Sequence, residues 1–386
     1  MIFSQKGLKC SINWSYRGFL LFSLVIFISC NSEPKVVTLA PINEIYQGTF
    51  DLHLDERTSQ ESFFLQAVGE DTVILLNRAE GNLVLFDAQG QVISKYYYAS
   101  DGPNRVNVNG FQYCHPDTIV TTDFYQNISL VDTAGKLKGK WKSFDLDKFE
   151  LEVDPSPTST NSSPFFKRGD KVYFNNAIFS DKIYSLFAEL DLRDGTINYL
   201  DIKFPEIYQS GFWVSNSFQF VSSTYLPKED ELIVNFPNLS SLYRYRFADG
   251  SLTEIPLAHS QLINEITALF PDKESARNAS PEALAKRELS KDFYHSLYLD
   301  RENEVYYRLV GIGKPESVYD AQSPEEQPLR EYALMVYDQE FQLQGEYTID
   351  AGVYNMLKVF ISPKGLHLMR LDSEEDKMSF DVFSFK

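Results

Sequence analysis

The sequence predicts an all-β fold, a six-bladed β-propeller of four-stranded antiparallel blades with a small helical insertion. Three observations predict it. A turn containing Asp or Asn recurs along the chain, each copy leads into a strand of alternating character, and one strand near the N-terminus remains to complete the last unit. The composition agrees, because 23 tyrosines and 30 phenylalanines suit packed sheets.

The repeat is most visible at the turn before the second strand of each unit. The turns occupy residues 69–73, 115–119, 168–172, 228–232, 301–305 and, in a looser copy, 362–366. Asp or Asn suits such turns because its side chain bonds nearby backbone. The spacing between the central Asp or Asn residues of the first five turns grows from 46 to 73 residues. That is the length of a propeller blade with insertions of increasing size.

Each turn is followed by strands that complete a blade. The second strands read TVILLN, TIVTTD, KVYFNN, ELIVNF, EVYYRL and GLHLMR. In the first four units, a glycine at position 90, 135, 195 or 250 closes the next hairpin, where positive φ is needed. Four antiparallel strands in sequence make one propeller blade.

The last unit contains three strands before Lys386. A missing outer strand leaves an exposed edge, and the alternating segment GTFDLHL at residues 48–54 can fill it. We therefore expect an N-terminal strand to close the ring, with the propeller spanning residues 48–386. A pair of β-sandwiches is the alternative, but it does not account for six turns in register.

The first 29 residues are typical of a lipoprotein signal peptide. Lys6, Lys9 and Arg17 precede an uncharged run at residues 18–29, which is too short to span a bilayer comfortably. Ser29 followed by Cys30 resembles a lipobox, and this resemblance implies that Cys30 is lipidated and holds the chain on a membrane. A membrane-anchoring first helix is the alternative. Residues 30–47 are expected to form a tether. The expected location is the cell envelope, bound to the outer membrane, with the leaflet left open.

Charge and cysteine content limit the function classes. The formal charge is −18, and removing residues 1–29 with their three positive charges makes it −21. Such a surface repels phosphate backbones, so we expect no nucleic-acid partner. Cys114 is the one cysteine left after Cys10 and Cys30 are assigned to the N-terminal segment, which indicates neither a disulfide framework nor a cysteine-rich metal site. We expect no cofactor, no metal and a monomer.

The long insertions all belong to loops on one face of the predicted ring, at residues 99–110, 143–164, 204–217, 258–292 and 308–330. Insertions confined to one face commonly mark the binding face. The longest, 258–292, has a good helix start at Ser280 and Pro281. We expect this helical insertion to lie over the ring as a lid or collar.

Polar residues gather where the second strands end on that face, and they are the candidate ligand-binding set: Asn77, Arg78, Asp123, Asn175, Asn176, Asn235, Arg308 and Arg370. Together they could grip a polar or anionic ligand, since Arg forks suit carboxylates. Tyr208 and Trp213, on an adjacent loop, could stack on a sugar ring. The alternatives are that strand ends beside loops are simply polar and that the aromatic residues anchor their loop.

The first long loop reads Ser100-Asp101-Gly102-Pro103-Asn104. With the lipobox and six blades, the chain resembles uncharacterised Bacteroidota lipoproteins that have a TolB-like six-bladed propeller. The resemblance covers the whole chain, and that family supplies no established catalytic residues. Because TolB itself binds partner proteins, the resemblance makes a protein partner plausible here. Asp101 and Asn104 depart from the Gly-x-Gly-Pro-Gly of neighbouring propeller families.

Sequence patterns for catalysis are weak. The five histidines, His53, His115, His259, His295 and His367, show no zinc-site spacing, and no nucleophile elbow or phosphate loop occurs. We therefore favour a non-catalytic binding or assembly module with a protein or polysaccharide partner. The alternative is a propeller hydrolase or lyase acting on a sugar, lactone or peptide in the funnel. Two acids, or an acid and a histidine, within hydrogen-bonding reach on the funnel floor would favour the enzyme.

Overall fold

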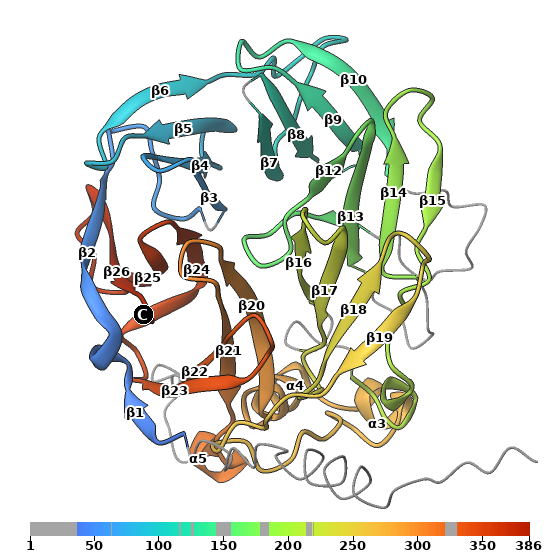
Figure 1. Cartoon of the computed structure of the whole chain (residues 1–386), viewed down its shortest axis with the longest axis vertical. Helices are drawn as coiled ribbons and strands as arrows, with labels where there is room; N and C mark the ends of the chain where they lie inside the picture. The colour runs from blue at the N-terminus through green and yellow to red at the C-terminus, as the bar shows by residue number, and fades with distance from the viewer. Residues whose placement is uncertain are drawn as a thin grey trace, which may run out of the picture. The chain divides into compact units, whose positions relative to one another are not determined.

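Six β-sheets stand around a ring in the computed structural model (Figure 1). The structure describes residues 37–62, 64–115, 117–123, 125, 127–143, 156–177, 185–213, 218, 220–320 and 330–386. Within it, Thr38–Lys386 forms one unit. The expected signal peptide and the lipidation site at Cys30 lie outside the described residues.

The first three blades follow in chain order. Blade one contains β3 (Leu65–Val68), β4 (Thr72–Asn77), β5 (Asn82–Phe86) and β6 (Val92–Tyr96). Blade two contains β7 (Gly110–His115), β8 (Thr118–Thr122), β9 (Asn127–Val131) and β10 (Leu137–Lys142). Blade three contains β11 (Ser156–Thr158), β12 (Phe166–Arg168), β13 (Lys171–Ala177), β14 (Phe187–Asp191) and β15 (Ile197–Tyr199).

The remaining blades follow in chain order, with most of the described helical segments in their connections. Blade four contains β16 (Ser222–Leu226), β17 (Glu231–Asn235), β18 (Leu242–Arg246) and β19 (Leu252–Ile255). Blade five contains β20 (Phe293–Asp300), β21 (Val305–Ile312), β22 (Glu331–Tyr337), β23 (Leu343–Ile349) and the added β1 (Leu39–Pro41). Blade six contains β24 (Tyr354–Ser362), β25 (Gly365–Arg370), β26 (Lys377–Phe383) and β2 (Tyr46–His53). The helices within the described residues are η1 (Ile42–Ile45), η3 (Glu206–Gln209), α3 (Lys273–Arg277), α4 (Pro281–Leu289) and α5 (Glu316–Asp320). The predicted fold class is confirmed.

An N-terminal strand closes the ring, as predicted. β2 pairs with β26 in antiparallel register, from Tyr46 opposite Phe383 to His53 opposite Lys377 (Figure 1). Gly90, at φ +72°, lets the first blade approach this strand, since an added Cβ there would stand 1.7 Å from the carbonyl oxygen of Asp51. The amide of His53 donates to the carbonyl of Gly90 at 2.8 Å, so β2 also contacts blade one.

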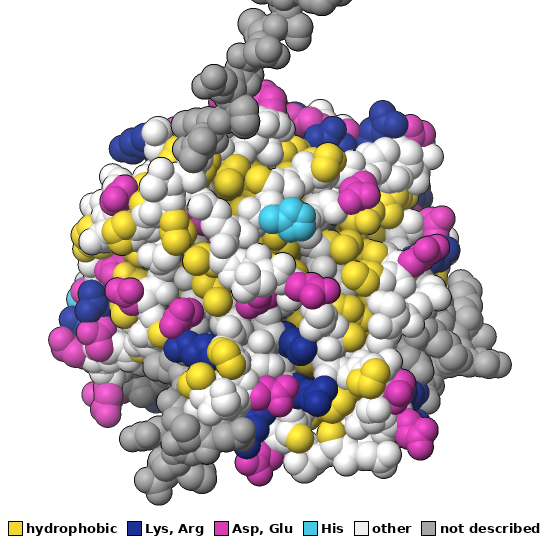
Figure 2. Space-filling view, turned by 90° about the horizontal axis from the view of Figure 1, so that it is seen from below, with side chains coloured by type: hydrophobic (Ala, Val, Ile, Leu, Met, Phe, Trp, Pro, Cys, Tyr) yellow, Lys and Arg dark blue, Asp and Glu magenta, His cyan; other side chains and the backbone are white. Residues whose placement is uncertain are grey.

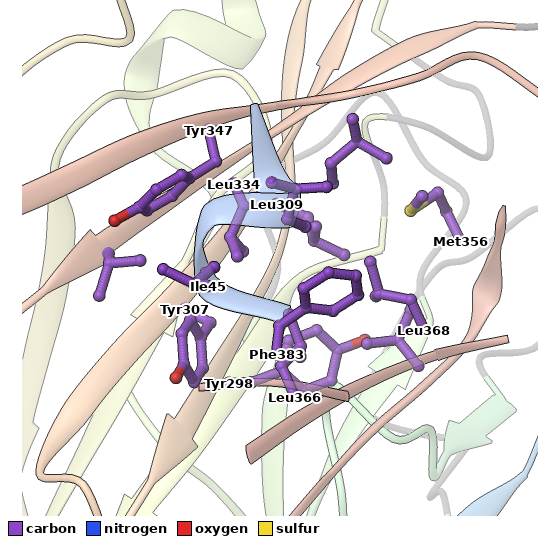
Figure 3. Packing of buried hydrophobic residues seen from close by; sticks show 14 of the residues in the cluster. Ile45, Tyr298, Tyr307, Leu309, Leu334, Tyr347, Met356, Leu366, Leu368 and Phe383 are labelled. Atoms are coloured by element: carbon purple, nitrogen blue, oxygen red, sulfur yellow. The ribbon is translucent and has the colours of Figure 1, made fainter. Parts of the chain in front are cut away.

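The later part of the expected tether at residues 30–47 is folded instead, because residues 39–47 belong to β1, η1 and the start of β2. β1 lies parallel to β23, with Leu39 opposite Glu346, and η1 buries Ile42 and Ile45. The physical reason is that these side chains are apolar and find a surface between blades five and six. A cluster of buried hydrophobic residues from blades five and six forms this surface, and Figure 3 shows Ile45 among Tyr307, Leu366 and Phe383 of the cluster.

The inner strand of blade three is interrupted. β11 and β12 both pair with β13, and the residues between them leave the sheet. Thr160 and Ser163 close a tight turn there through two backbone hydrogen bonds, each of 3.2 Å. We call residues 159–163 the central turn, because they contact the inner strands of other blades.

Candidate functional site

A cavity of about 810 Å³ opens on the face that carries the long loops. Its wall includes Phe64 just before β3, Phe220 just before β16 and Phe293 at the start of β20. Each stands where a long connection enters an inner strand, so the cavity lies at that end of the ring. α4, from the predicted helical insertion, adds Ala285, Glu288 and Leu289 to the wall.

The central turn forms the floor of the cavity through residues 160–163. It is held by four other blades. Ser159 Oγ donates to the carbonyl of Phe111 in blade two at 3.0 Å, and Asn161 Oδ1 accepts from the amide of Leu65 in blade one at 2.9 Å. Asn161 Nδ2 donates to the carbonyl of Val359 in blade six at 2.7 Å.

Blade four completes these contacts. The amide of Ser223 donates to the carbonyl of Ser162 at 2.8 Å, and the hydroxyls of Ser163 and Ser223 lie 3.1 Å apart. Residues far apart in the chain therefore hold one short turn inside the ring, and its hydroxyl and amide groups are positioned before any ligand arrives.

The apolar part of the wall reaches the rim. Phe220 and Leu357, both in the cavity lining, are 40% and 66% exposed. Deeper in the wall, burial raises the pKa of Tyr298 to about 12, so its hydroxyl stays protonated and able to donate. The cavity is therefore aromatic and aliphatic at its mouth and polar at its floor.

One side of the wall carries the charged groups. The guanidinium of Arg330 donates to the carbonyls of Lys291 and Glu288, and it lies 4.7 Å from the ring centroid of Phe293. Burial lowers the pKa of Arg330, and burial with the charge of Arg330 lowers the pKa of His295 to about 4. His295 is thus neutral at pH 7, with Nδ1 at 2.8 Å from Ser296 Oγ.

Of the predicted ligand-binding residues, all of which the structure describes, Asn175 lines this cavity and the others do not. Asn235 and Arg308 lie together in the interior, where Arg308 Nε donates to Asn235 Oδ1 at 2.8 Å. Arg308 is fully buried, also donates to the carbonyls of Leu239 and Ser240, and lies 3.7 Å from the ring centroid of Tyr294. Its donors are engaged within the protein, and burial lowers its pKa.

The other predicted polar residues also have partners of their own, or lie apart. Asp123 accepts from the amides of Tyr125 and Asn127 at 2.8 and 2.9 Å and so holds its own turn. Asn77 donates to the carbonyl of Arg57, and Arg78 to Asn109 Oδ1. The hydrogen bond to Asp372, with the charges of Asp381 and Asp372, raises the pKa of Arg370. Asn176 is buried, and no described residue bonds its side chain.

Tyr208 and Trp213 anchor their loop. Trp213 Nε1 donates to the carbonyl of Ile207 at 3.1 Å, and the Tyr208 hydroxyl donates to the carbonyl of Phe218 at 2.7 Å. Both rings pack in buried aromatic clusters, one of which also contains Phe293 of the cavity wall, but neither Tyr208 nor Trp213 lines the cavity. This geometry agrees with the anchoring alternative.

Sequence reasoning missed Arg330 and the central turn, and it considered His295 beside an inner strand but did not select it as a ligand-binding residue. The run TSTNSS at residues 158–163 was visible, but nothing local indicated that it would enter the ring. The described floor residues supply hydroxyls and amides, without an acid, and the described wall holds one acid, Glu288, and one histidine. Within the described part of the chain, no group of three or more His, Cys, Asp or Glu side chains could hold a metal ion.

None of the helices that the structure describes is long and apolar enough to cross a membrane.

Comparisons with known proteins agree with this architecture. The family model for a domain of unknown function, DUF4221, matches residues 87–348. A crystal structure of a DUF4221 member from Bacteroides vulgatus superposes with a TM-score of 0.73 at 18% identity, covering 89% of this chain and 98% of the other. A Bacteroides fragilis protein whose name describes it as exported gives a TM-score of 0.57 at 11% identity, covering 90% and 98%. No curated protein matches the sequence.

Proposed function

The chain belongs to the DUF4221 family, and we propose that it is a non-catalytic binding module of the cell envelope that takes its partner at the cavity on the long-loop face. The partner is a protein segment or a polar, carbohydrate-like ligand. One observation carries the proposal, namely the cavity with a floor held by four other blades.

The dimensions and lining of the cavity support binding. Its volume of about 810 Å³ falls within the ~300–1,000 Å³ typical of ligand pockets. Such pockets combine apolar walls with a few well-placed polar groups, which fix the orientation of the ligand. Here Phe220 and Leu357 provide apolar surface at the mouth, while the central turn provides the polar groups.

The envelope location is supported by the N-terminal sequence. Ser29 and Cys30 follow an uncharged run, and a structural relative is described as exported. Tethering by a lipid on Cys30 would place the cavity at a membrane surface, where the outer membrane is the expected site. Replacing Cys30 with Ser should move the chain from the membrane pellet to the soluble fraction; a variant that stays in the pellet would refute lipid anchoring.

A matched pair of substitutions on α4 tests the cavity itself. Ala285 is exposed and lines the cavity, so Ala285→Trp fills its entrance without replacing a buried side chain. Glu282 is exposed on the same helix outside the lining, so Glu282→Trp is the control. Both full-length variants are purified from the native envelope, and the molecules retained are compared with those retained by the wild type.

The proposal expects Ala285→Trp to lose the retained molecules and Glu282→Trp to keep them. If Ala285→Trp retains the same molecules in the same amounts, the cavity is not the binding site.

A further inference from the structure

Two asparagines occupy matching positions in neighbouring blades. Asn175 ends the pairing of β13 with β14, opposite Phe187, and Asn235 ends the pairing of β17 with β18, opposite Leu242. The side-chain N–H of each asparagine donates to a backbone carbonyl at or just before the inner strand of the next blade. Asn175 Nδ2 bonds the carbonyl of Val221 at 3.0 Å, and Asn235 Nδ2 bonds the carbonyl of Tyr294 at 3.3 Å.

The two side chains differ in the hydrogen bonding of the amide oxygen Oδ1. Asn235 Oδ1 accepts from Arg308 Nε at 2.8 Å, whereas no described residue donates to Asn175 Oδ1. The bond to Val221 fixes which end of the Asn175 amide is oxygen. Asn175 is 6% exposed and is one of the residues that line the cavity, and its Oδ1 is buried without a donor from the described residues. A buried acceptor without a donor is unfavourable, so this position favours a ligand that brings an O–H or N–H group.

The groups around Asn175 narrow the class of ligand. The neighbouring floor carries the hydroxyls of Thr160, Ser162 and Ser163. Thr160 and Ser162 bond each other and Ser163 bonds Ser223, and each hydroxyl has further capacity because it can both donate and accept. A ligand that matches them carries several neutral groups that also do both. The wall beside the floor is aromatic, with Phe64 and Tyr298, and favours a flat, weakly polar ring face.

We propose that the cavity binds a saccharide, with one sugar hydroxyl donating to Asn175 Oδ1 and the C–H face of a ring against the aromatic wall. This assignment rests on the proposed function, because it names the ligand class of the same cavity. A sugar joins neutral hydroxyls to an apolar ring face, and that combination fits a hydroxyl and amide floor below aromatic walls. The net negative charge of the chain does not oppose a neutral glycan.

Two substitutions at one position isolate the acceptor. Asn175→Leu and Asn175→Asp both lose the bond to Val221, but only Asn175→Asp keeps oxygen acceptors at the floor. The full chain in lipid nanodiscs is applied to an array of neutral and acidic oligosaccharides, and affinities for the bound glycans are measured by titration calorimetry. Thermal melting checks that the two variants are equally folded.

We expect array glycans to bind the wild type, with Asn175→Leu binding on the order of tenfold more weakly than Asn175→Asp. Equal affinities of the two variants would overturn the role of Asn175 Oδ1. The absence of any bound glycan overturns the saccharide assignment. If short peptides bind instead, and Ala285→Trp blocks their binding, the proposed binding function stands but the saccharide assignment is wrong. Glycan binding that Ala285→Trp leaves unchanged contradicts both proposals.

Discussion

Arg308 and Arg370 look alike in the sequence, since each follows the alternating residues of a second strand, yet they lie in different environments. Arg308 is fully buried and donates to Asn235 and to two carbonyls, while Arg370 is 38% exposed at its side chain and pairs with Asp372 at 2.8 Å. At the residue scale, therefore, the two guanidiniums should differ in their contribution to stability.

Arg308→Ala should lower the free energy of unfolding by roughly 3 kcal/mol or more. It leaves Asn235 Oδ1 and the carbonyls of Leu239 and Ser240 without their buried donor, at ~1–3 kcal/mol for each unsatisfied group. Arg370→Ala should change it by ~0–1 kcal/mol, since exposed ion pairs contribute little. Urea denaturation followed by circular dichroism measures both, and equal losses would contradict the assigned environments.

His367 links stability to pH. It is buried, with Nε2 at 2.7 Å from Ser362 Oγ and its ring stacked on Phe360 at 4.3 Å. Burial and the nearby charge of Lys364 lower the pKa of His367 from 6.5 to about 3. The unfolded chain therefore takes up a proton as pH falls below 6.5, while the folded chain does not. The stability that His367 contributes is complete above pH 6.5 and is lost as pH falls toward 3.

We expect His367→Phe to reduce the loss of stability between pH 6.5 and about 4.5. The contribution removed is at most ~1.4 kcal/mol per pH unit for one group, and carboxylates titrate mainly below this window. Urea denaturation of both chains at a series of pH values provides the measurement. Above pH 7, the two curves should run parallel; an unchanged slope below pH 6.5 would show that His367 is not the linked group.

The central turn shows how one short element joins a whole ring. Asn161 bonds Leu65 in blade one and Val359 in blade six, the two blades that meet where the ring closes. A polar side chain at this point can bond both because it leaves the sheet of blade three. Its role at the element scale is to connect blades that share no strand.

Asn161→Ala should destabilise the propeller by roughly 2–5 kcal/mol, because the amide of Leu65 and the carbonyl of Val359 both lose a partner. Asn198→Ala is the control, since Asn198 is exposed on the outer strand β15. Thermal melting of both variants decides the question. A melting temperature for Asn161→Ala that matches the control would mean that the turn does not brace the ring.

At the scale of the whole molecule, stability depends on the junction of the first and last blades. β2 completes blade six, β1 extends blade five, and η1 packs Ile42 and Ile45 between them.

The charged side chains, in contrast, are spread over the surface. On the side of the ring shown in Figure 2, acidic and basic side chains are interspersed with apolar ones despite the net charge of −18.

Deleting residues 31–45 should therefore lower stability by roughly 3–6 kcal/mol, at ~1.5–3 kcal/mol for each of the two buried isoleucines. Total stability of a domain is ~5–15 kcal/mol, so the loss should be large. Deleting residues 31–37 is the control, because the unit that contains the propeller begins at Thr38. Equal melting temperatures for the two truncations would show that η1 and β1 do not support the closure.

Local patterns were enough to predict the ring. The turn at Asp230 has φ +56°, and the hairpin at Gly90 has φ +72°, so each turn residue stands where the backbone needs it. The second strands between such turns are apolar on both faces, as in β4 and β17, and the stacking of neighbouring blades buries both faces. The closing strand also followed, because the last unit contained three strands and one alternating segment remained near the N-terminus.

The candidate site was predicted only in part. We selected polar residues at the ends of the second strands, and this criterion identified Asn175. The same criterion also selected Asn235 and Arg308, which bond one another in the interior. The pattern of a single strand does not reveal which neighbour approaches from the next blade. That neighbour decides whether a polar group is available to a ligand.

The sequence by itself determined the fold class, the number of blades and the face with the long loops, because turns and alternation act over a few residues. Only the tertiary structure decided where the cavity lies and what forms its floor. Asn161 meets Leu65 from 96 residues away and Val359 from 198 residues away. Contacts over such separations arise when blades close around one axis, and they depend on the three-dimensional packing of the inner strands, which leaves no periodic signal along the chain.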